Sequence, residues 1–193
     1  MPSPERPLLA AVVLAAGGSS RFSAGPKQFA ELRGRPLVFQ AVEAALGVEE
    51  FVAVFVVSGA VDLHGVLPDG AMVLDNPQWA QGQATSLAVA VHAAHVGGFD
   101  ALVVGLADQP FVGADAWQLI ATADADRPIT VATYAGQRGN PVRLAREVWP
   151  LLTTDGDEGA RALMRERPEL VGEVACPGDP IDIDTVEDLE RWS

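Results

Sequence analysis

One cysteine, Cys176, is present among the 193 residues, so the chain cannot form an internal disulfide. This excludes a small scaffold held together by disulfides and suits a reducing cytoplasm. Basic residues are also few, with 13 Lys and Arg against 26 Asp and Glu, and the net charge of -13 argues against a nucleic-acid partner. No apolar run approaches the ~20 residues that span a bilayer, and the N-terminus lacks the basic and apolar segments of a signal peptide. We therefore expect a cytoplasmic protein without a membrane partner.

The residues that are present suit one globular domain of ordinary size. Hydrophobic residues make up 49% of the chain and charged residues 20%, which is typical of a soluble domain. We expect a single domain over residues 1–193, with residues 1–7 as a flexible tail.

Strand-like and helix-like segments alternate along the chain. Apolar runs predict strands at Leu8–Ala15, Phe51–Ser58, Ala71–Leu74, Ala101–Gly105 and Ile129–Thr133. Helices are predicted at Leu37–Leu46, Ala84–Val96, Ala114–Ala123, Glu158–Glu166 and Thr185–Trp192. This alternation predicts an α/β fold with a mostly parallel central sheet and helices on both faces. Ligands of such sheets bind at the carboxyl ends of the strands, so we expect the motifs that follow strands to converge on one cleft.

The first strand runs directly into a loop rich in glycine and serine, and the segment Val13–Lys27 reads VLAAGGSSRFSAGPK. Its small side chains would let phosphate groups approach the main-chain N–H groups. Gly17 and Gly18 permit backbone angles that are closed to other residues, and Arg21 and Lys27 add positive charge. The loop matches neither a Walker A nor a three-glycine dinucleotide sequence. It favours a nucleoside triphosphate site, with an ordinary strand-to-helix turn as the alternative.

Aspartates follow the strand that ends at Gly105 and precede the last predicted helix. Asp108 is placed to hold Mg²⁺, which uses one or two carboxylates together with substrate phosphates; capping of the next turn is the alternative. Asp184 is predicted to be the N-cap of the final helix, with Glu187 completing a capping box. As an alternative, Asp184 or Asp182 would be a second magnesium ligand.

A polar turn containing Asn76 leads to Gln83 and Ser86 at the start of the helix Ala84–Val96. A helix N-terminus favours an anion or a polar base edge, so these side chains would contact a nucleobase or ribose. Helix capping is the alternative.

Two later segments offer basic side chains at predicted turns. Gln137–Val142 contains Arg138, a charge-assisted donor for a second substrate, or forms a hairpin-like turn. Gly156–Arg161 opens a helix, where Arg161 is a phosphate ligand or a surface arginine.

Together these motifs resemble the MobA-like nucleotidyltransferases, and within them the molybdenum cofactor cytidylyltransferases. The matching segments run in order over most of the chain and read LAAGGSSRF with Lys27, NPQWAQGQATSL, LADQP, RGNPV, GDEGAR and DIDTVEDL. The resemblance implies a Rossmann-like three-layer sandwich of the nucleotide-diphospho-sugar transferase type. It also implies transfer of a nucleoside monophosphate, CMP from CTP, to a phosphate on a molybdopterin-type acceptor, with Mg²⁺ as cofactor and release of pyrophosphate. A molybdoenzyme or its maturation chaperone is the protein partner that this activity implies.

The resemblance assigns roles to the matching positions. The catalytic charges would be those of Arg21, Lys27 and Asp108. The nucleotide would be held by Leu14, Ala15, Ala16, Gly17, Gly18, Lys27, Asn76, Gln83, Ser86 and Asp108. The acceptor would meet Arg138, Asn140 and Arg161, and Mg²⁺ would be held by Asp108 and Asp184, with Asp182 as the alternative.

Several readings stay open beside this one. Guanylyl members usually have a glycine where this chain has Ala16, which favours CTP over GTP, whereas cytidylyl members often have histidine where this chain has Asn140. The PKQFAEL segment is similar to the cytidylyltransferases of isoprenoid synthesis, but an arginine usual in those enzymes shortly before Pro110 is absent. A non-catalytic accessory protein that binds a nucleotide or cofactor is the alternative from another class. The presence of Lys27 and Asp108 argues against it.

Overall fold

The computed structural model describes residues 6–124 and 126–193, so residues 1–5 of the predicted tail lie outside the described residues. Within these ranges, seven strands form one sheet in the order β5-β4-β1-β6-β8-β7-β9. All neighbouring pairs run parallel except those that involve β8, which is antiparallel to both β6 and β7. The strands are β1 (Leu9–Leu14), β4 (Phe51–Ser58), β5 (Ala71–Asp75), β6 (Ala101–Leu106), β7 (Ile129–Tyr134), β8 (Gln137–Ala145) and β9 (Val171–Ala175).

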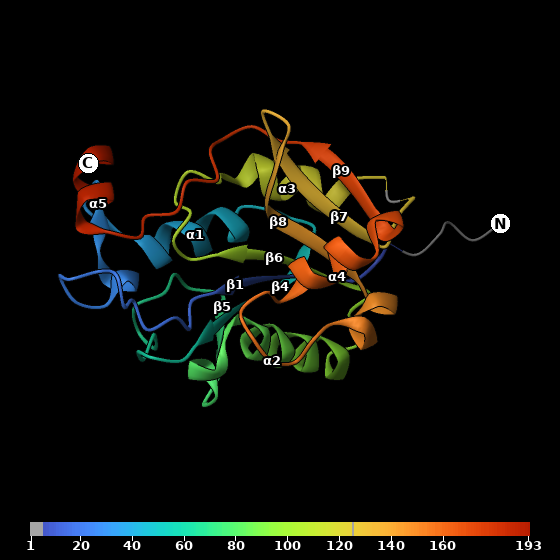
Figure 1. Cartoon of the computed structure of the whole chain (residues 1–193), viewed down its shortest axis with the longest axis horizontal. Coiled ribbons are helices and arrows are strands. Elements are labelled where there is room, and N and C mark those ends of the chain that lie inside the picture. The colour runs from blue at the N-terminus through green and yellow to red at the C-terminus, as the bar shows by residue number, and fades with distance from the viewer. Residues whose placement is uncertain (1–5, 125) are drawn as a thin grey trace.

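Helices cover both faces of this sheet and give three layers (Figure 1). On one face lie α1 (Leu37–Leu46) and α3 (Ala114–Thr122), and on the other lie α2 (Gln83–Val96) and α4 (Ala160–Glu166). The last helix, α5 (Val186–Trp192), packs at the side on a two-stranded hairpin, β2 (Glu31–Leu32) and β3 (Arg35–Pro36). The predicted α/β three-layer sandwich is confirmed.

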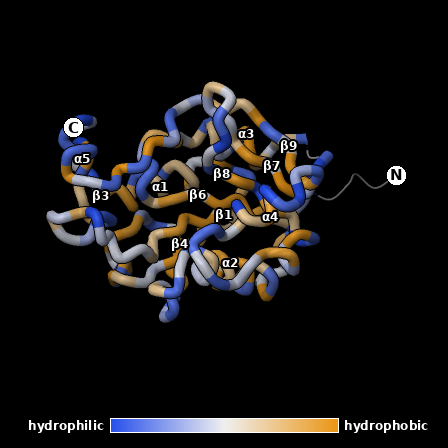
Figure 2. Tube along the Cα trace, viewed as in Figure 1, coloured by the Kyte–Doolittle hydropathy of each residue, from blue (hydrophilic) through white to orange (hydrophobic). Residues whose placement is uncertain are grey.

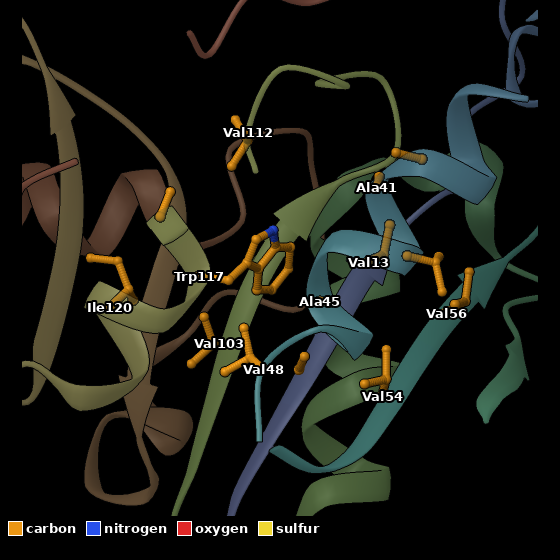
Figure 3. Close-up of a cluster of buried hydrophobic side chains, with 14 of the residues drawn as sticks. Val13, Ala41, Ala45, Val48, Val54, Val56, Val103, Val112, Trp117 and Ile120 are labelled. Atoms are coloured by element: carbon orange, nitrogen blue, oxygen red, sulfur yellow. The ribbon is translucent and has the colours of Figure 1, made fainter. Parts of the chain in front are cut away.

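The core consists of two apolar layers, because alternate residues of each strand face opposite sides. Ala11 and Val13 of β1 face α1 and α3, whereas Ala10 and Val12 face α2. Figure 3 shows Trp117 of α3 among the valines of the central strands, and Figure 2 shows that these strands form the most hydrophobic part of the trace. Strands β1, β4 and β6 read as continuous apolar runs because both of their faces are covered.

The structure differs from the sequence-based expectation in the C-terminal half of the sheet. Gln137–Ala145 is the long strand β8 and not a turn, and Val171–Ala175 is an unpredicted edge strand. The final helix begins one residue later than predicted. Its N-cap is Thr185, and Asp188 completes the capping box in place of Glu187.

Short 3₁₀ segments complete the connections, at Lys27–Phe29, Trp79–Gln81, Arg146–Leu151 and Pro168–Leu170. Within the described residues, no helix combines the length and apolar character required to cross a membrane.

Candidate active site

The site forms at the carboxyl ends of β1 and β6, which lie side by side in the middle of the sheet. Leu14 pairs with Leu106, and the Ala107 N–H donates to the Leu14 carbonyl at 3.1 Å. The loop after β1 and Asp108 after β6 therefore emerge at the same edge, as expected for neighbouring parallel strands.

Gln28, which sequence reasoning missed, holds the loop after β1 in shape. Its buried amide donates to the carbonyls of Ala15 and Gly17 at 2.8 and 2.7 Å. The Ser19 hydroxyl donates to Gln28 Oε1 at 3.1 Å and accepts from the Lys27 N–H at 2.9 Å. The Lys27 backbone is thus hydrogen-bonded to the loop after β1. The position of Gln28 directly after Lys27 in the quoted PKQF segment was the available signal.

The backbone N–H groups of the loop from Gly17 to Arg21 are not used in hydrogen bonds among the described residues. Unused N–H groups are the condition for a phosphate-binding cradle. The glycines act differently from the prediction, because the positive φ of 54° falls at Ser19. Gly18 is required by close packing, since a Cβ there would lie 2.8 Å from the Trp79 ring, whereas a Cβ at Gly17 would meet nothing within 4 Å.

Lys27 lies between two carboxylates from distant parts of the chain. Its Nζ is 2.7 Å from Asp108 Oδ2 and 2.8 Å from Asp184 Oδ1, and the three side chains are only 16%, 24% and 22% exposed. Arg21 pairs with the second oxygen of Asp184 at 2.9 Å. The structure therefore brings together all the predicted catalytic residues and the preferred second metal ligand.

Burial and neighbouring charges shift the pKa values of Lys27 and Asp182. Burial alone lowers the pKa of the Lys27 ammonium, but attraction and hydrogen bonds from Asp108 and Asp184 outweigh it and raise that pKa above its usual 10.5. The nearby Asp182 carboxyl has a raised pKa, first because it is partly removed from water and then because Asp108 repels its charge. Lys27 is thus firmly a cation in this group.

The carboxylates suit a hard divalent cation. Asp108 Oδ1 is buried and has no hydrogen-bond partner among the described residues, and carboxylate oxygens are the ligands that Mg²⁺ and Mn²⁺ prefer. In the part of the chain that the structure describes, no cluster of three or more His, Cys, Asp or Glu is arranged to hold a metal alone. Substrate phosphates and water would have to complete the coordination.

The start of α2 forms one wall of the cleft. Gln83 and Ser86 line it as predicted. Asn76 does not, because its side chain is buried beneath the wall and its amide donates to the hydroxyls of Thr85 and Ser86, both at 2.9 Å. The structure therefore gives Asn76 a supporting role. Because the Ser86 oxygen accepts from the Asn76 amide, the Ser86 hydroxyl proton can be donated to a different acceptor.

The adjoining part of the wall comes from the loop before α4, which folds onto the start of α2. The Ala84 N–H donates to the Gly156 carbonyl at 2.9 Å, and Gly82 is essential because a Cβ there would lie 2.3 Å from that oxygen. This contact places Asp157 and Arg161 on the cleft. Asp157 was not predicted, since its position depends on the folded path of the loop.

Of the two residues predicted on β8 to contact the acceptor, the structure brings one to the site. Asn140 lines a narrow slot beside the cleft, and its amide donates to Gln109 at 3.1 Å. Arg138 does not line the cleft or the slot and pairs with Glu173 of the edge strand β9 at 2.7 Å. The two differ because Asn140 lies beside the end of β6, whereas Arg138 lies further toward the β7–β8 turn.

The cleft consists of two adjoining cavities of about 450 Å³ each, a size suited to a small-molecule ligand. Four carboxylates line it against three basic side chains. The carboxylates belong to Asp108, Asp157, Asp182 and Asp184, and the basic groups to Arg21, Lys27 and Arg161.

Comparisons with known proteins show similarity over nearly the whole chain. A family model described as a MobA-like NTP transferase domain matches residues 11–171. The nicotine blue oxidoreductase of Paenarthrobacter nicotinovorans is 29% identical over 198 residues, which cover 96% of each chain. The crystal structure of Rv0371c from Mycobacterium tuberculosis H37Rv is similar with a TM-score of 0.82 at 29% identity, over 96% of this chain and 97% of that one.

A second structure of Rv0371c, a complex with manganese, has a TM-score of 0.74 and 27% identity over 96% of this chain and 97% of that one. A divalent metal thus occurs in a similar protein. Because the family model spans most of the chain, including the loop after β1 and Asp108, the chain belongs to the MobA-like NTP transferase family.

Proposed function

We propose that the protein transfers CMP from CTP to a phosphate on an acceptor of the molybdopterin type and releases pyrophosphate. The observation that carries the proposal is that Lys27, Asp108 and Asp184 line one cavity with a loop whose N–H groups have no acceptor among the described residues. Nucleotidyl transfer needs hydrogen-bond donors for the phosphates and carboxylates for a hard metal ion, and it needs no protein nucleophile.

The charge of the cleft supports a metal-dependent reaction. Four carboxylates face three basic groups, so the cleft cannot neutralise a nucleoside triphosphate by itself. Asp108 and Asp184 would hold Mg²⁺, with Asp182 beside them. When bound, the metal would neutralise phosphate charge and orient the phosphates.

The residues of the chain would perform positioning and charge stabilisation. The backbone from Leu14 to Gly18 would hold the base and the phosphates. Arg21 and Lys27 would bind the phosphate oxygens, where their charges stabilise the negative charge that develops as pyrophosphate leaves. The acceptor phosphate attacks the α-phosphorus in line, so holding the two partners together is a major part of catalysis.

Contacts at the start of α2 support a nucleoside site next to the phosphate loop. Gln83 and the Ser86 hydroxyl line the cavity that also contains Ala16 and Trp79. The methyl group of Ala16, where guanylyl members have glycine, reduces the space beside the base and favours CTP over GTP. Arg161 would bind the phosphate of the acceptor by charge-assisted hydrogen bonds, and a molybdoenzyme or its chaperone would receive the product.

Pyrophosphate release with each of the four nucleoside triphosphates, with and without molybdopterin, tests this function. We expect release that requires Mg²⁺ and molybdopterin and is fastest with CTP. Release that is independent of the acceptor and of the base would contradict a dedicated transferase.

A second candidate follows from the relative that is named an oxidoreductase and is 29% identical over nearly the whole chain. The loop N–H groups that would suit a triphosphate would also bind the diphosphate of a redox dinucleotide. Oxidation of NADH or NADPH in the presence of nicotine blue measures this activity directly. Oxidation without any nucleotidyl transfer would favour the second candidate.

A further inference from the structure

Strand β8 contains a bulge at Asn140 and Pro141. The β7–β8 ladder skips two residues of β8, Asn140 and Pro141. Bulges of this kind leave residues unpaired and re-aim their side chains. The Tyr134 hydroxyl donates to the Asn140 carbonyl at 2.6 Å and holds the bulged backbone. The Asn140 side chain then meets Gln109 in the loop after β6.

Gln109 fixes which way the Asn140 amide points. The Gln109 side chain is buried, and its NH₂ group donates to the Pro180 carbonyl at 3.1 Å and to Asp182 Oδ1 at 2.9 Å. A backbone carbonyl only accepts hydrogen bonds, so the NH₂ group must face Pro180 and the amide oxygen must face Asn140. Only the NH₂ group of Asn140 can meet that oxygen, at 3.1 Å. The Pro180 carbonyl therefore determines the orientation of both the Gln109 amide and the Asn140 amide.

This arrangement leaves the Asn140 Oδ1 atom free at the site. Within the described ranges no protein group donates to it, and it is not among the buried polar atoms that lack a partner, so solvent reaches it. Asn140 lines a slot together with Gln83 and Arg161. The Asn140 amide is thus held in one orientation in a slot that the phosphate-binding candidate Arg161 also lines.

The slot is a side extension of the main cleft, because Leu14, Gln83 and Arg161 line both. Its volume is about 40 Å³, enough for a small group and too little for a fused ring system. Most of its lining is apolar, and the slot is also lined by Glu158; the large apolar residues are Leu14, Leu87, Val104, Val142, Leu144 and Met164.

We propose that Asn140 is a specificity-determining residue for the acceptor: its Oδ1 accepts a hydrogen bond from an N–H or O–H group at the acceptor edge that enters this slot. Gln109 is the positioning residue that holds the Asn140 oxygen outward. The acceptor class is thus a phosphate ester that carries such a donor on a compact edge. This inference rests on the proposed transfer reaction.

Steady-state transfer of CMP to molybdopterin by the full-length protein tests the inference with Asn140→Leu and Gln109→Met. Each variant should raise the KM for molybdopterin by about 3–10-fold, the effect of one neutral hydrogen bond, and leave the KM for CTP unchanged. Gln40→Met is the matched control, because the Gln40 amide also donates to two backbone carbonyls but lies outside the cleft. It should change neither KM.

An unchanged molybdopterin KM in both site variants would overturn the inference and leave the transfer reaction standing. Absence of transfer by the wild-type protein with any nucleotide would refute the proposed function, and with it the acceptor role of Asn140. NMR resonances of the side-chain amides test the hydrogen bond between Gln109 and Asn140 separately. The Asn140 Nδ2 protons should exchange with solvent faster in Gln109→Met than in the wild type. Equal exchange rates would overturn the positioning role of Gln109.

Discussion

Replacing Lys27 by methionine tests the charged group at the centre of the site. The substitution keeps an unbranched side chain that is one atom shorter and removes the cation that lies 2.7 Å from Asp108 and 2.8 Å from Asp184. Two carboxylates that are less than a quarter exposed then face each other, and the remaining partner, Arg21, is 73% exposed. An exposed arginine contributes little to neutralising the two carboxylates. Without metal, the variant should therefore be less stable than the wild type.

The expected loss can be bounded from the burial of the three groups. Breaking a fully buried ion pair costs about 3–5 kcal/mol, whereas exposed pairs contribute about 0–1 kcal/mol. The intermediate exposure of Lys27, Asp108 and Asp184 places the loss at about 2 kcal/mol. For a chain of this size that corresponds to a fall in Tm of about 4–8 °C.

Magnesium should restore part of this stability, because a divalent cation can take the place of the lost ammonium. At ten times its Kd, a ligand that binds only the folded state adds about 1.4 kcal/mol. Thermal unfolding of wild type and Lys27→Met, with and without Mg²⁺, measures both effects. The double variant Lys27→Met/Asp108→Asn is the control and should lose the magnesium response. An unchanged Tm in Lys27→Met, or equal magnesium responses in all three proteins, would refute the reasoning.

Three further predictions concern the cleft. Asp108→Asn should lower kcat for CMP transfer by about 100-fold or more with an unchanged circular dichroism spectrum, and wild-type turnover would contradict its role. Gly17→Val should raise the KM for CTP with little change in Tm, because a Cβ at this position meets nothing within 4 Å. Gly18→Val should lower the free energy of unfolding by about 1–3 kcal/mol, because its side chain clashes with the Trp79 ring. The opposite pattern would refute the assigned glycine roles. Arg161→Gln should raise the molybdopterin KM by roughly 10–100-fold, the effect of a charge-assisted hydrogen bond, while Arg165→Gln on the same helix should not; equal KM changes would contradict a direct contact.

Most of the N-terminal half of the fold was predictable because its signals are strong and local, whereas the short β2–β3 hairpin was not predicted. The predicted Phe51–Ser58 strand and Leu37–Leu46 helix match the structure at both ends, since buried parallel strands and amphipathic helices have distinct patterns. Strand β8 was missed because Gly139 and Pro141 punctuate its sequence, and β9 because an edge strand that is only partly buried lacks a continuous apolar run.

The candidate site was predictable as a set of residues and not as a set of contacts. Lys27 and Asp108 are 81 residues apart, and Lys27 and Asp184 are 157 apart, so their ion pairs depend on strand order, which no local pattern contains. The same limit applies to Asn76 and Arg138. Asn76 lies in a polar turn and Arg138 in β8, but the direction of each side chain follows from tertiary packing, beneath α2 for Asn76 and toward β9 for Arg138.

The most direct test of the proposed function follows the α-phosphate of CTP. Incubation of the protein with α-labelled CTP, Mg²⁺ and molybdopterin should move the label to the acceptor, with one pyrophosphate released per label transferred. Label recovered only in CTP or free CMP, with no labelled acceptor from any of the four nucleoside triphosphates, would contradict nucleotidyl transfer by this cleft.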